Sequence, residues 1–246
     1  MGPALTPIAR QSLSDAVFAQ LRARIMNGEM QPGTTLPAER ALSEMLGVNR
    51  GSVREALKRL EQARLVSIQH GGATRVLDYR ATAGMDLLAE LLLTPTGGLD
   101  LEVARSILEM RAVLAPDIAR LCALRGGPEC AAKLDAVVLE MKAAEGDLAA
   151  LQGLALEFWN LLVEGSRNVA YRLAYNSLRE TYTKLQDLLT QVLADEHRDL
   201  AGFRTLSDAV RRGDTAKAER RAAELVRGGT ERMLEIIDKV ARLEDM

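Results

Sequence analysis

The sequence predicts a mainly α-helical protein in two parts, a small N-terminal domain with one β-hairpin and a larger antiparallel helical bundle. Apolar residues recur at helical spacing through most of the chain, and strand-like alternation occurs near residues 65–77. The length of 246 residues and the hydrophobic fraction of 48% are typical of a globular protein with one or two domains. The composition excludes disordered and collagen-like chains.

The first elements are helices that end at recognisable breaks. An amphipathic helix is expected over residues 12–26, where an Asn-Gly pair follows. A short helix comes after Pro37 and stops at Gly47, because glycine favours the left-handed conformation found at helix C-termini. A third helix is expected over residues 52–63, with an apolar stripe along one face. Two helices joined by a tight glycine turn predict a helix-turn-helix.

A β-hairpin is expected directly behind the third helix. Residues 65–69 and 74–77 are rich in β-formers, and His70 begins the His-Gly-Gly turn between them. A hairpin in this place is the wing of a winged helix-turn-helix. We therefore expect residues 1–80 to form a winged helix-turn-helix DNA-binding domain.

The rest of the chain is predicted to be helical. Residues 81–98 are expected to form a linker with a short helix, and residues 99–246 an all-α antiparallel bundle. Glycine, proline and asparagine mark the breaks between segments of helical periodicity. The expected helices cover residues 82–93, 99–125, 128–145, 147–165, 169–194, 196–212 and 214–241.

The charge is divided unevenly along the chain. The net charge is −2, from 32 basic and 34 acidic residues. Residues 1–80 contain 11 basic and 7 acidic residues, hence +4, and the remaining residues contain 21 and 27, hence −6. This asymmetry is typical of a nucleic-acid-binding domain joined to a domain with another role.

The third helix has a cationic face opposite its apolar stripe. Arg50, Arg54 and Lys58 recur every four residues, so one face packs and the other presents cations. Arginine can bond both major-groove acceptors of a guanine, and the adjacent Asn49 and Ser52 suit a base or a phosphate. A solvated basic face would be the alternative for an isolated helix. The preceding helix, the tight turn and the wing favour a recognition helix.

The wing tip offers a further contact. His70 could be an ordinary turn residue, but the neighbouring Gly71 allows close approach of the backbone to a ligand. At such a tip, a histidine can reach a phosphate or the minor groove. We expect both residues to contact DNA.

A family resemblance covers these same residues. The run LPAERALSEMLGVNRGSVREALKRLEQAR, from Leu36 to Arg64, resembles the DNA-binding domain of the GntR family. The segments SIQHGGATRV and YRATAGMDLL resemble its FadR branch, and the likeness continues less sharply over nearly the whole chain. The resemblance implies a homodimeric transcription factor on a palindromic operator of double-stranded DNA. Together with Lys58 on the cationic face, the DNA-contacting positions are expected to be Arg40, Asn49, Arg50, Gly51, Ser52, Arg54, His70 and Gly71.

The resemblance also bears on metal binding. Most bundles of the FadR branch hold a metal ion through one Asp and three His. Aligned on that branch, the ligand positions fall here on Ala155, Trp159, Arg204 and Arg227, none of which suits a metal ion. The chain has two histidines, and His70 belongs to the wing. We therefore expect no metal cofactor.

An effector site is expected in the bundle. Six of the eight aromatic residues lie between positions 158 and 203, where they either line one cavity or fill the core. By resemblance, Arg111 matches a family arginine that faces the effector, whereas Arg204 and Arg227 are weaker candidates that could be surface cations. A buried cation must meet an anion, either on the ligand or on a buried Glu. The expected effector-binding residues are Arg111, Phe158, Trp159, Tyr171, Tyr175, Tyr182, Phe203, Arg204 and Arg227.

Together these features predict a ligand-responsive transcription regulator of fatty acid metabolism. The expected effector is a fatty acyl-coenzyme A or a related lipid, which releases or repositions the protein on DNA. A small carboxylate bound without a metal is one alternative, and a constitutive dimeric DNA-binding protein is another. An enzyme is not expected, because the sequence has no G-x-S-x-G elbow, P-loop or dinucleotide-binding motif.

The remaining expectations concern compartment and thiols. The sequence shows no signal peptide and no apolar run near the ~20 residues that span a bilayer, so we expect a cytoplasmic protein without a membrane partner. Cys122 and Cys130 lack a C-x-x-C spacing. In that compartment they are expected to be buried small hydrophobes rather than a disulfide or a metal pair.

Overall fold

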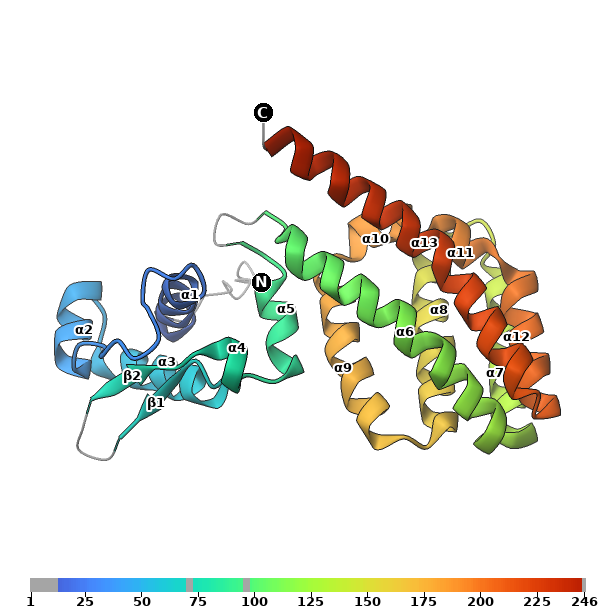
Figure 1. The fold of residues 1–246 in the computed structure, drawn as a ribbon, viewed down its shortest axis with the longest axis horizontal. Coiled ribbons are helices and arrows are strands. Elements are labelled where there is room, and N and C mark those ends of the chain that lie inside the picture. Colours follow the sequence, from blue (N-terminus) through green and yellow to red (C-terminus); the bar gives the residue numbers. More distant parts are fainter. Residues whose placement is uncertain (1–12, 70–72, 95–97, 245–246) are drawn as a thin grey trace, which may run out of the picture. The chain divides into compact units, whose positions relative to one another are not determined.

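A computed structural model describes residues 13–69, 73–94 and 98–244 (Figure 1). The chain forms two compact units, one that comprises Met1–Leu87 and Thr94–Thr96 and one that comprises Leu88–Leu93 and Gly97–Met246. The mainly α-helical fold class, with a winged helix-turn-helix domain followed by a helical bundle, is confirmed.

The first unit is a three-helix domain with a hairpin. It contains α1 (Leu13–Met26), α2 (Glu39–Leu46), α3 (Arg50–Gln62), β1 (Val66–Ile68), β2 (Thr74–Val76), α4 (Tyr79–Thr82) and a 3-10 turn, Met85–Leu87. The strands are antiparallel, with Val66 opposite Val76. The segment that precedes α2 also joins β2, because Leu36 N donates to Thr74 O over 2.8 Å. Gly47 ends α2 in the left-handed conformation, with φ of 65°.

The core of the first unit includes the apolar stripe predicted on the third helix. Val53, Leu57 and Leu60 of α3 are all buried. Arg59 bonds Asp15 of α1 at 2.5 Å and lies 4.3 Å from the ring centroid of Phe18. The buried stripe holds α3 against α1 and leaves its opposite face to solvent.

The described part of the second unit is built from α-helices and one isolated bridge between Leu93 and Leu99. It contains α5 (Leu88–Leu91), α6 (Leu101–Arg125), α7 (Gly127–Ala143), α8 (Leu148–Ser166), α9 (Val169–Lys184), α10 (Gln186–Val192), α11 (Ala194–Arg198), α12 (Leu200–Arg212) and α13 (Thr215–Glu244). The helices α6 and α13 lie side by side (Figure 1). Among the described residues, no helix is both long enough and apolar enough to cross a membrane.

Three expected helices are broken in the structure, so their sequence-based boundaries were wrong. The one expected over residues 82–93 is interrupted at Ala83, which is extended (φ −76°, ψ 158°). The one expected over residues 169–194 breaks at Leu185, which packs against an apolar cluster. The one expected over residues 196–212 breaks at Asp199, whose carboxylate accepts from Gly202 N over 2.8 Å and caps α12. Tertiary packing and capping override helical periodicity at these points.

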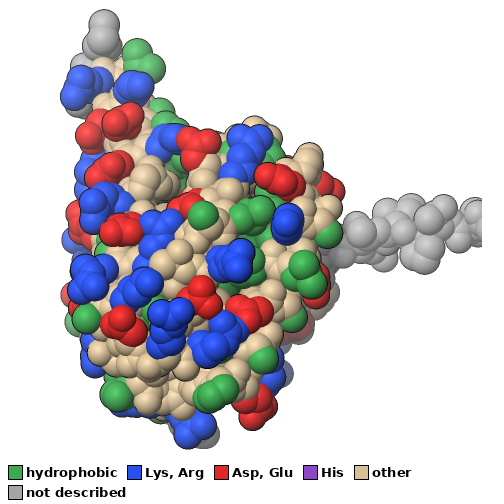
Figure 2. Space-filling model, turned by 90° about the vertical axis from the view of Figure 1, so that its right-hand side faces the viewer, with side chains coloured by type: hydrophobic (Ala, Val, Ile, Leu, Met, Phe, Trp, Pro, Cys, Tyr) green, Lys and Arg blue, Asp and Glu red, His purple; other side chains and the backbone are tan. Residues whose placement is uncertain are grey.

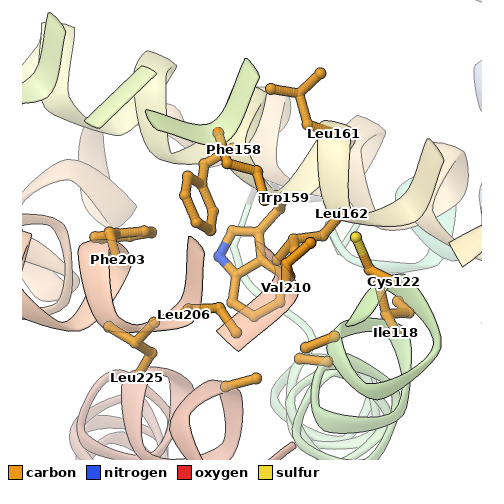
Figure 3. Packing of buried hydrophobic residues seen from close by; sticks show 14 of the residues in the cluster. Ile118, Cys122, Phe158, Trp159, Leu161, Leu162, Phe203, Leu206, Val210 and Leu225 are labelled. Carbon is orange, nitrogen blue, oxygen red and sulfur yellow. The ribbon is translucent and has the colours of Figure 1, made fainter. Parts of the chain in front are cut away.

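Two apolar clusters form the interior of the second unit. The larger joins α6, α7, α8, α12 and α13, and its centre is an edge-to-face pair of Phe158 and Phe203 with ring centroids 4.9 Å apart (Figure 3). The smaller contains Leu92, Leu193 and Met233. On the face of this unit drawn in Figure 2, Lys and Arg are interspersed with Asp and Glu. That face is therefore no continuous cationic surface of the kind that binds DNA.

Candidate functional site

The exposed face of α3 carries the predicted cations. Arg50, Arg54 and Lys58 are exposed, opposite the buried stripe. Asn49 is the N-cap of the helix, and its Oδ1 accepts from Ser52 N over 2.9 Å. Because Oδ1 is used by the cap, the side-chain nitrogen Nδ2 of Asn49 remains as a donor at the helix N-terminus, where anions are favoured.

Two of the arginines are held by carboxylates of α2. Arg54 donates three hydrogen bonds to Glu39, at 2.8–3.1 Å. These bonds, with the nearby charges, hold the pKa of Glu39 below its usual range. Arg40 is bonded to Glu44 at 3.0 Å. Within the part of the chain that the structure describes, Arg50 and Lys58 have no such ion pair. Arg50 and Lys58 can therefore bind DNA without first breaking an ion pair.

The other predicted DNA contacts are placed differently. Gly51 is exposed on the first turn of α3, and a Cβ there would lie 3.1 Å from Asn49 Oδ1. Glycine therefore leaves the cap undisturbed. His70 and Gly71 lie outside the described residues.

The second unit contains an apolar cavity of about 50 Å³ between its two apolar clusters. Helices α6, α8, α9, α11 and α13 supply its walls. Its lining residues are Arg111, Ala115, Ile118, Ala155, Leu156, Trp159, Tyr175, Leu178, Arg179, Tyr182, Glu196, His197 and Val226. Arg179 is exposed as well as lining the cavity, so it marks the place where the cavity meets solvent.

The polar part of the cavity wall is a buried ion pair. Arg111 donates to Glu196 Oε1, to Val226 O over 3.3 Å and to Thr230 Oγ1 over 3.2 Å. The side chains of Arg111 and Glu196 are only 10% and 3% exposed. Burial raises the pKa of Glu196, and the guanidinium of Arg111 opposes that rise. A Cβ at Gly229 would lie 2.5 Å from Glu196 Oε2, so only a glycine at this position leaves space for the carboxylate.

His197 lies beside this pair and is neutral at physiological pH. Burial, with a smaller contribution from the charge of Arg111, lowers its pKa from 6.5 to about 4. Its Nδ1 is buried and has no hydrogen-bond partner among the described residues. Burial also raises the pKa of Tyr182, to about 12. Both rings therefore present uncharged polar groups in the cavity wall.

The pKa of His197 predicts a pH dependence of stability. Between pH 6.5 and about 4 the unfolded chain binds a proton at His197 that the folded chain does not, so stability is lost as the pH falls through this window. We expect the wild type to lose about 2 kcal/mol more than a His197→Asn variant between pH 7 and pH 5. Urea unfolding at the two pH values measures this difference. Equal losses would contradict the buried neutral state of His197.

The structure divides the clustered aromatic residues between the cavity and other surroundings. Trp159, Tyr175 and Tyr182 line the cavity. Phe158 and Phe203 instead pack against each other in the core, both fully buried (Figure 3). Tyr171 donates to Asp117 Oδ2 over 2.7 Å, away from the cavity. Helical periodicity places α8 aromatics on neighbouring faces, which is why Phe158 and Trp159 point to different surroundings.

Two predicted cations do not reach the cavity. Arg204 is exposed in a surface groove lined by α7 and α12, and Arg227 is exposed on α13. Both are therefore surface cations. Of the four aligned metal-ligand positions, Ala155 and Trp159 line the cavity and these two arginines do not. Within the described ranges, no three His, Cys, Asp or Glu side chains cluster closely enough to hold a metal ion.

Several residues of these sites were not predicted from the sequence. The ones with charged or titratable side chains include Glu39, Arg179, Glu196 and His197. A buried arginine needs an anion nearby, so a partner for Arg111 was expected. The sequence contains 34 acidic residues and does not show which of them is that partner. Glu196 and His197 were assigned to the start of the helix expected over residues 196–212. The break at Asp199 is what brings them inward.

Comparisons with known proteins identify both domains. Residues 13–76 match the model of the gntR family of bacterial regulatory proteins, and residues 106–228 match the FCD domain. The chain is 38% identical to the HTH-type transcriptional regulator Mce2R of Mycobacterium tuberculosis, over 97% of this chain and 99% of that protein. It is 33% identical to the fatty acid metabolism regulator protein of Serratia proteamaculans, over 70% and 71% of the two chains.

A solved structure shares the fold. The structure of Lar, described as controlling the Listeria monocytogenes agr system, superimposes with a TM-score of 0.56. The identity is 16%, and the overlap covers 93% of this chain and 99% of that one.

Proposed function

Because this chain belongs to the GntR family of bacterial regulatory proteins and is a DNA-binding transcriptional regulator, we propose that its FCD domain binds a long-chain fatty acyl-coenzyme A. The effector shifts a homodimer between states that differ in affinity for a palindromic operator. Several relatives, among them the one from Serratia proteamaculans, are named fatty acid metabolism regulator proteins, and we infer the same role here. The site uses no metal ion.

The observation that supports this effector class is the neutralised cation in an apolar cavity. Glu196 already compensates the charge of Arg111. A small carboxylate that bound Arg111 would displace Glu196 and leave a second anion buried without a partner, which is costly. An alkyl chain is uncharged, so it can bind without displacing Glu196. It also fits walls formed by side chains such as Ile118, Trp159 and Leu178.

The charged end of the proposed effector has its own partner. Coenzyme A carries phosphates, and these stay near solvent while the acyl chain enters the cavity. Arg179 lies at the solvent edge of the cavity, where it can pair with a phosphate. A free fatty acid lacks the phosphates and would gain less from this arginine.

The volume of the cavity makes binding depend on a rearrangement. About 50 Å³ holds only part of a long acyl chain, so side chains around it must move for the chain to enter. A ligand that binds only an opened state shifts the population towards that state. Because the effector binds only the opened state of the cavity, its binding changes the conformation of the helical domain.

Thermal-shift titration tests the proposal. Acyl-coenzyme A thioesters of increasing chain length, the matching free fatty acids and small hydroxy and oxo acids are compared as ligands. We expect stabilisation that increases with acyl chain length and is strongest for the thioesters. Arg179→Ala should weaken thioester binding by about fivefold or more, as expected for one lost charge-assisted contact, and weaken the binding of free fatty acids less.

Arg204→Ala is the matched control, because Arg204 is equally exposed but lies outside the cavity. It should bind all ligands as the wild type does. Stabilisation by small acids alone would overturn the lipid assignment. No stabilisation by any ligand would favour a constitutive DNA-binding protein whose bundle serves dimerisation.

A further inference from the structure

The strongest feature outside these sites is a pair of thiols. Cys122 of α6 and Cys130 of α7 are both free, and their Sγ atoms lie 3.5 Å apart. Gly165 of α8 leaves space for both sulfur atoms, because a Cβ at this position would lie 2.5 Å from Cys122 Sγ and 2.7 Å from Cys130 Sγ. The backbone of α8 thus passes directly against both sulfur atoms.

The two thiols differ in access. Cys122 is fully buried, whereas Cys130 is half-buried and lines an open pocket of about 180 Å³. Cys122 does not line that pocket. A small oxidant that enters the pocket therefore meets Cys130 first, with Cys122 in contact behind it.

From this geometry we propose that Cys122 and Cys130 are an oxidative modification site, which a hydroperoxide converts into a reversible intramolecular disulfide. Neither thiol lines the effector cavity. The expectation that the two cysteines are only small hydrophobic residues describes their packing but not their contact with each other.

The chemistry balances with a hydroperoxide as the oxidant. The Cys130 thiolate attacks one peroxide oxygen, the O–O bond breaks, and Cys130 becomes a sulfenic acid while hydroxide leaves. Cys122 Sγ then attacks Cys130 Sγ, the S–O bond breaks, and the departing hydroxide takes the Cys122 proton to form water. The net reaction oxidises two thiols to a disulfide and reduces hydrogen peroxide to two waters.

The electrostatic surroundings assign the attacking role to Cys130. A hydrogen bond from the Cys122 thiol lowers the pKa of Cys130, and the charge of Lys133 acts in the same direction against burial, Glu129 and Glu164. The pKa of Cys122 is raised, first by this hydrogen bond and then by burial. The more accessible thiol is thus also the more easily ionised one.

A disulfide here would join the end of α6 to α7. The same α6 lines the effector cavity through Ala115 and Ile118, and Ile118 lies one turn before Cys122. Oxidation would therefore constrain the helix that forms one wall of the cavity.

Oxidation of the purified full-length protein by a small molar excess of hydrogen peroxide tests the site. We expect the two free thiols to disappear, the intact mass to fall by about 2 Da, and dithiothreitol to restore both. Peptide mapping should show Cys122 linked to Cys130 within one chain. Thiols that persist, disulfides between chains, or a gain of oxygen without a disulfide would each overturn the proposal.

Two isosteric variants test the order of the steps. In Cys122→Ser, Cys130 should form a sulfenic acid that dimedone traps. In Cys130→Ser, the buried Cys122 should react at least about tenfold more slowly. Equal reaction rates in the two variants would contradict the assignment of Cys130 as the attacking thiol. The mass measurement on the wild type stands even if a variant is unstable.

Discussion

Replacing Arg111 by methionine is expected to lower the free energy of unfolding by about 3–5 kcal/mol. The substitution removes the partner of Glu196, whose side chain is 3% exposed, and leaves a carboxylate buried without compensation. It also leaves Val226 O and Thr230 Oγ1 without the donor that they share. Urea unfolding at pH 7 measures the loss.

The double variant Arg111→Met/Glu196→Leu separates the cost of an unpaired charge from the cost of lost packing. An apolar pair of similar volume restores a neutral interior, so we expect stability within about 1 kcal/mol of the wild type. Arg204→Ala, at an exposed arginine of the same unit, should change stability by less than about 0.5 kcal/mol. A single-variant loss below about 1 kcal/mol would show that Glu196 can reach water.

Arg50→Ala is expected to weaken operator binding by about 1–3 kcal/mol, which corresponds to roughly 5- to 150-fold. Arg50 is exposed at the first turn of α3 and is not engaged by a carboxylate within the described residues. Its side chain is therefore available to a base edge or a phosphate. Selection from a random DNA library with the wild-type protein supplies the operator, and a gel-shift titration measures the affinity.

The sequence dependence of the loss identifies the contact. A base contact relaxes specificity at one operator position, whereas a phosphate contact weakens all sequences equally and lowers the salt dependence of binding by about one counterion. Arg212→Ala, at an exposed arginine on α12, is the control and should bind as the wild type does. Unchanged affinity of Arg50→Ala would remove Arg50 from the DNA-binding surface.

Glu39→Gln is expected to raise the affinity for non-specific DNA, by a smaller factor than Arg50→Ala lowers the affinity for the operator. Arg54 loses an ionised partner, and the DNA-facing surface loses one negative charge. We expect affinity for non-specific DNA to rise about two- to fivefold at low salt, because phosphate attraction governs this binding. Specificity for the selected operator should fall, since Glu39 no longer orients Arg54. A drop in non-specific affinity would contradict this account of the pair.

The sequence by itself determined the fold class of this protein and the exposed cationic face of α3. Local signals suffice for both: the periodic apolar residues of α3 bury one face, so the cations between them must face solvent. Gly47 needs only its own backbone conformation to end α2. Arg50 and Lys58 could thus be placed without knowledge of any distant residue.

Only the tertiary structure decided the cavity and the thiol pair. Arg111 and Glu196 are 85 residues apart, and the sequence does not show which carboxylate meets the buried guanidinium. Phe158 and Trp159 are neighbours in sequence, yet one fills the core and the other lines the cavity. Burial, charge pairing and cavity shape arise where helices distant in the chain pack together, so local periodicity cannot specify them.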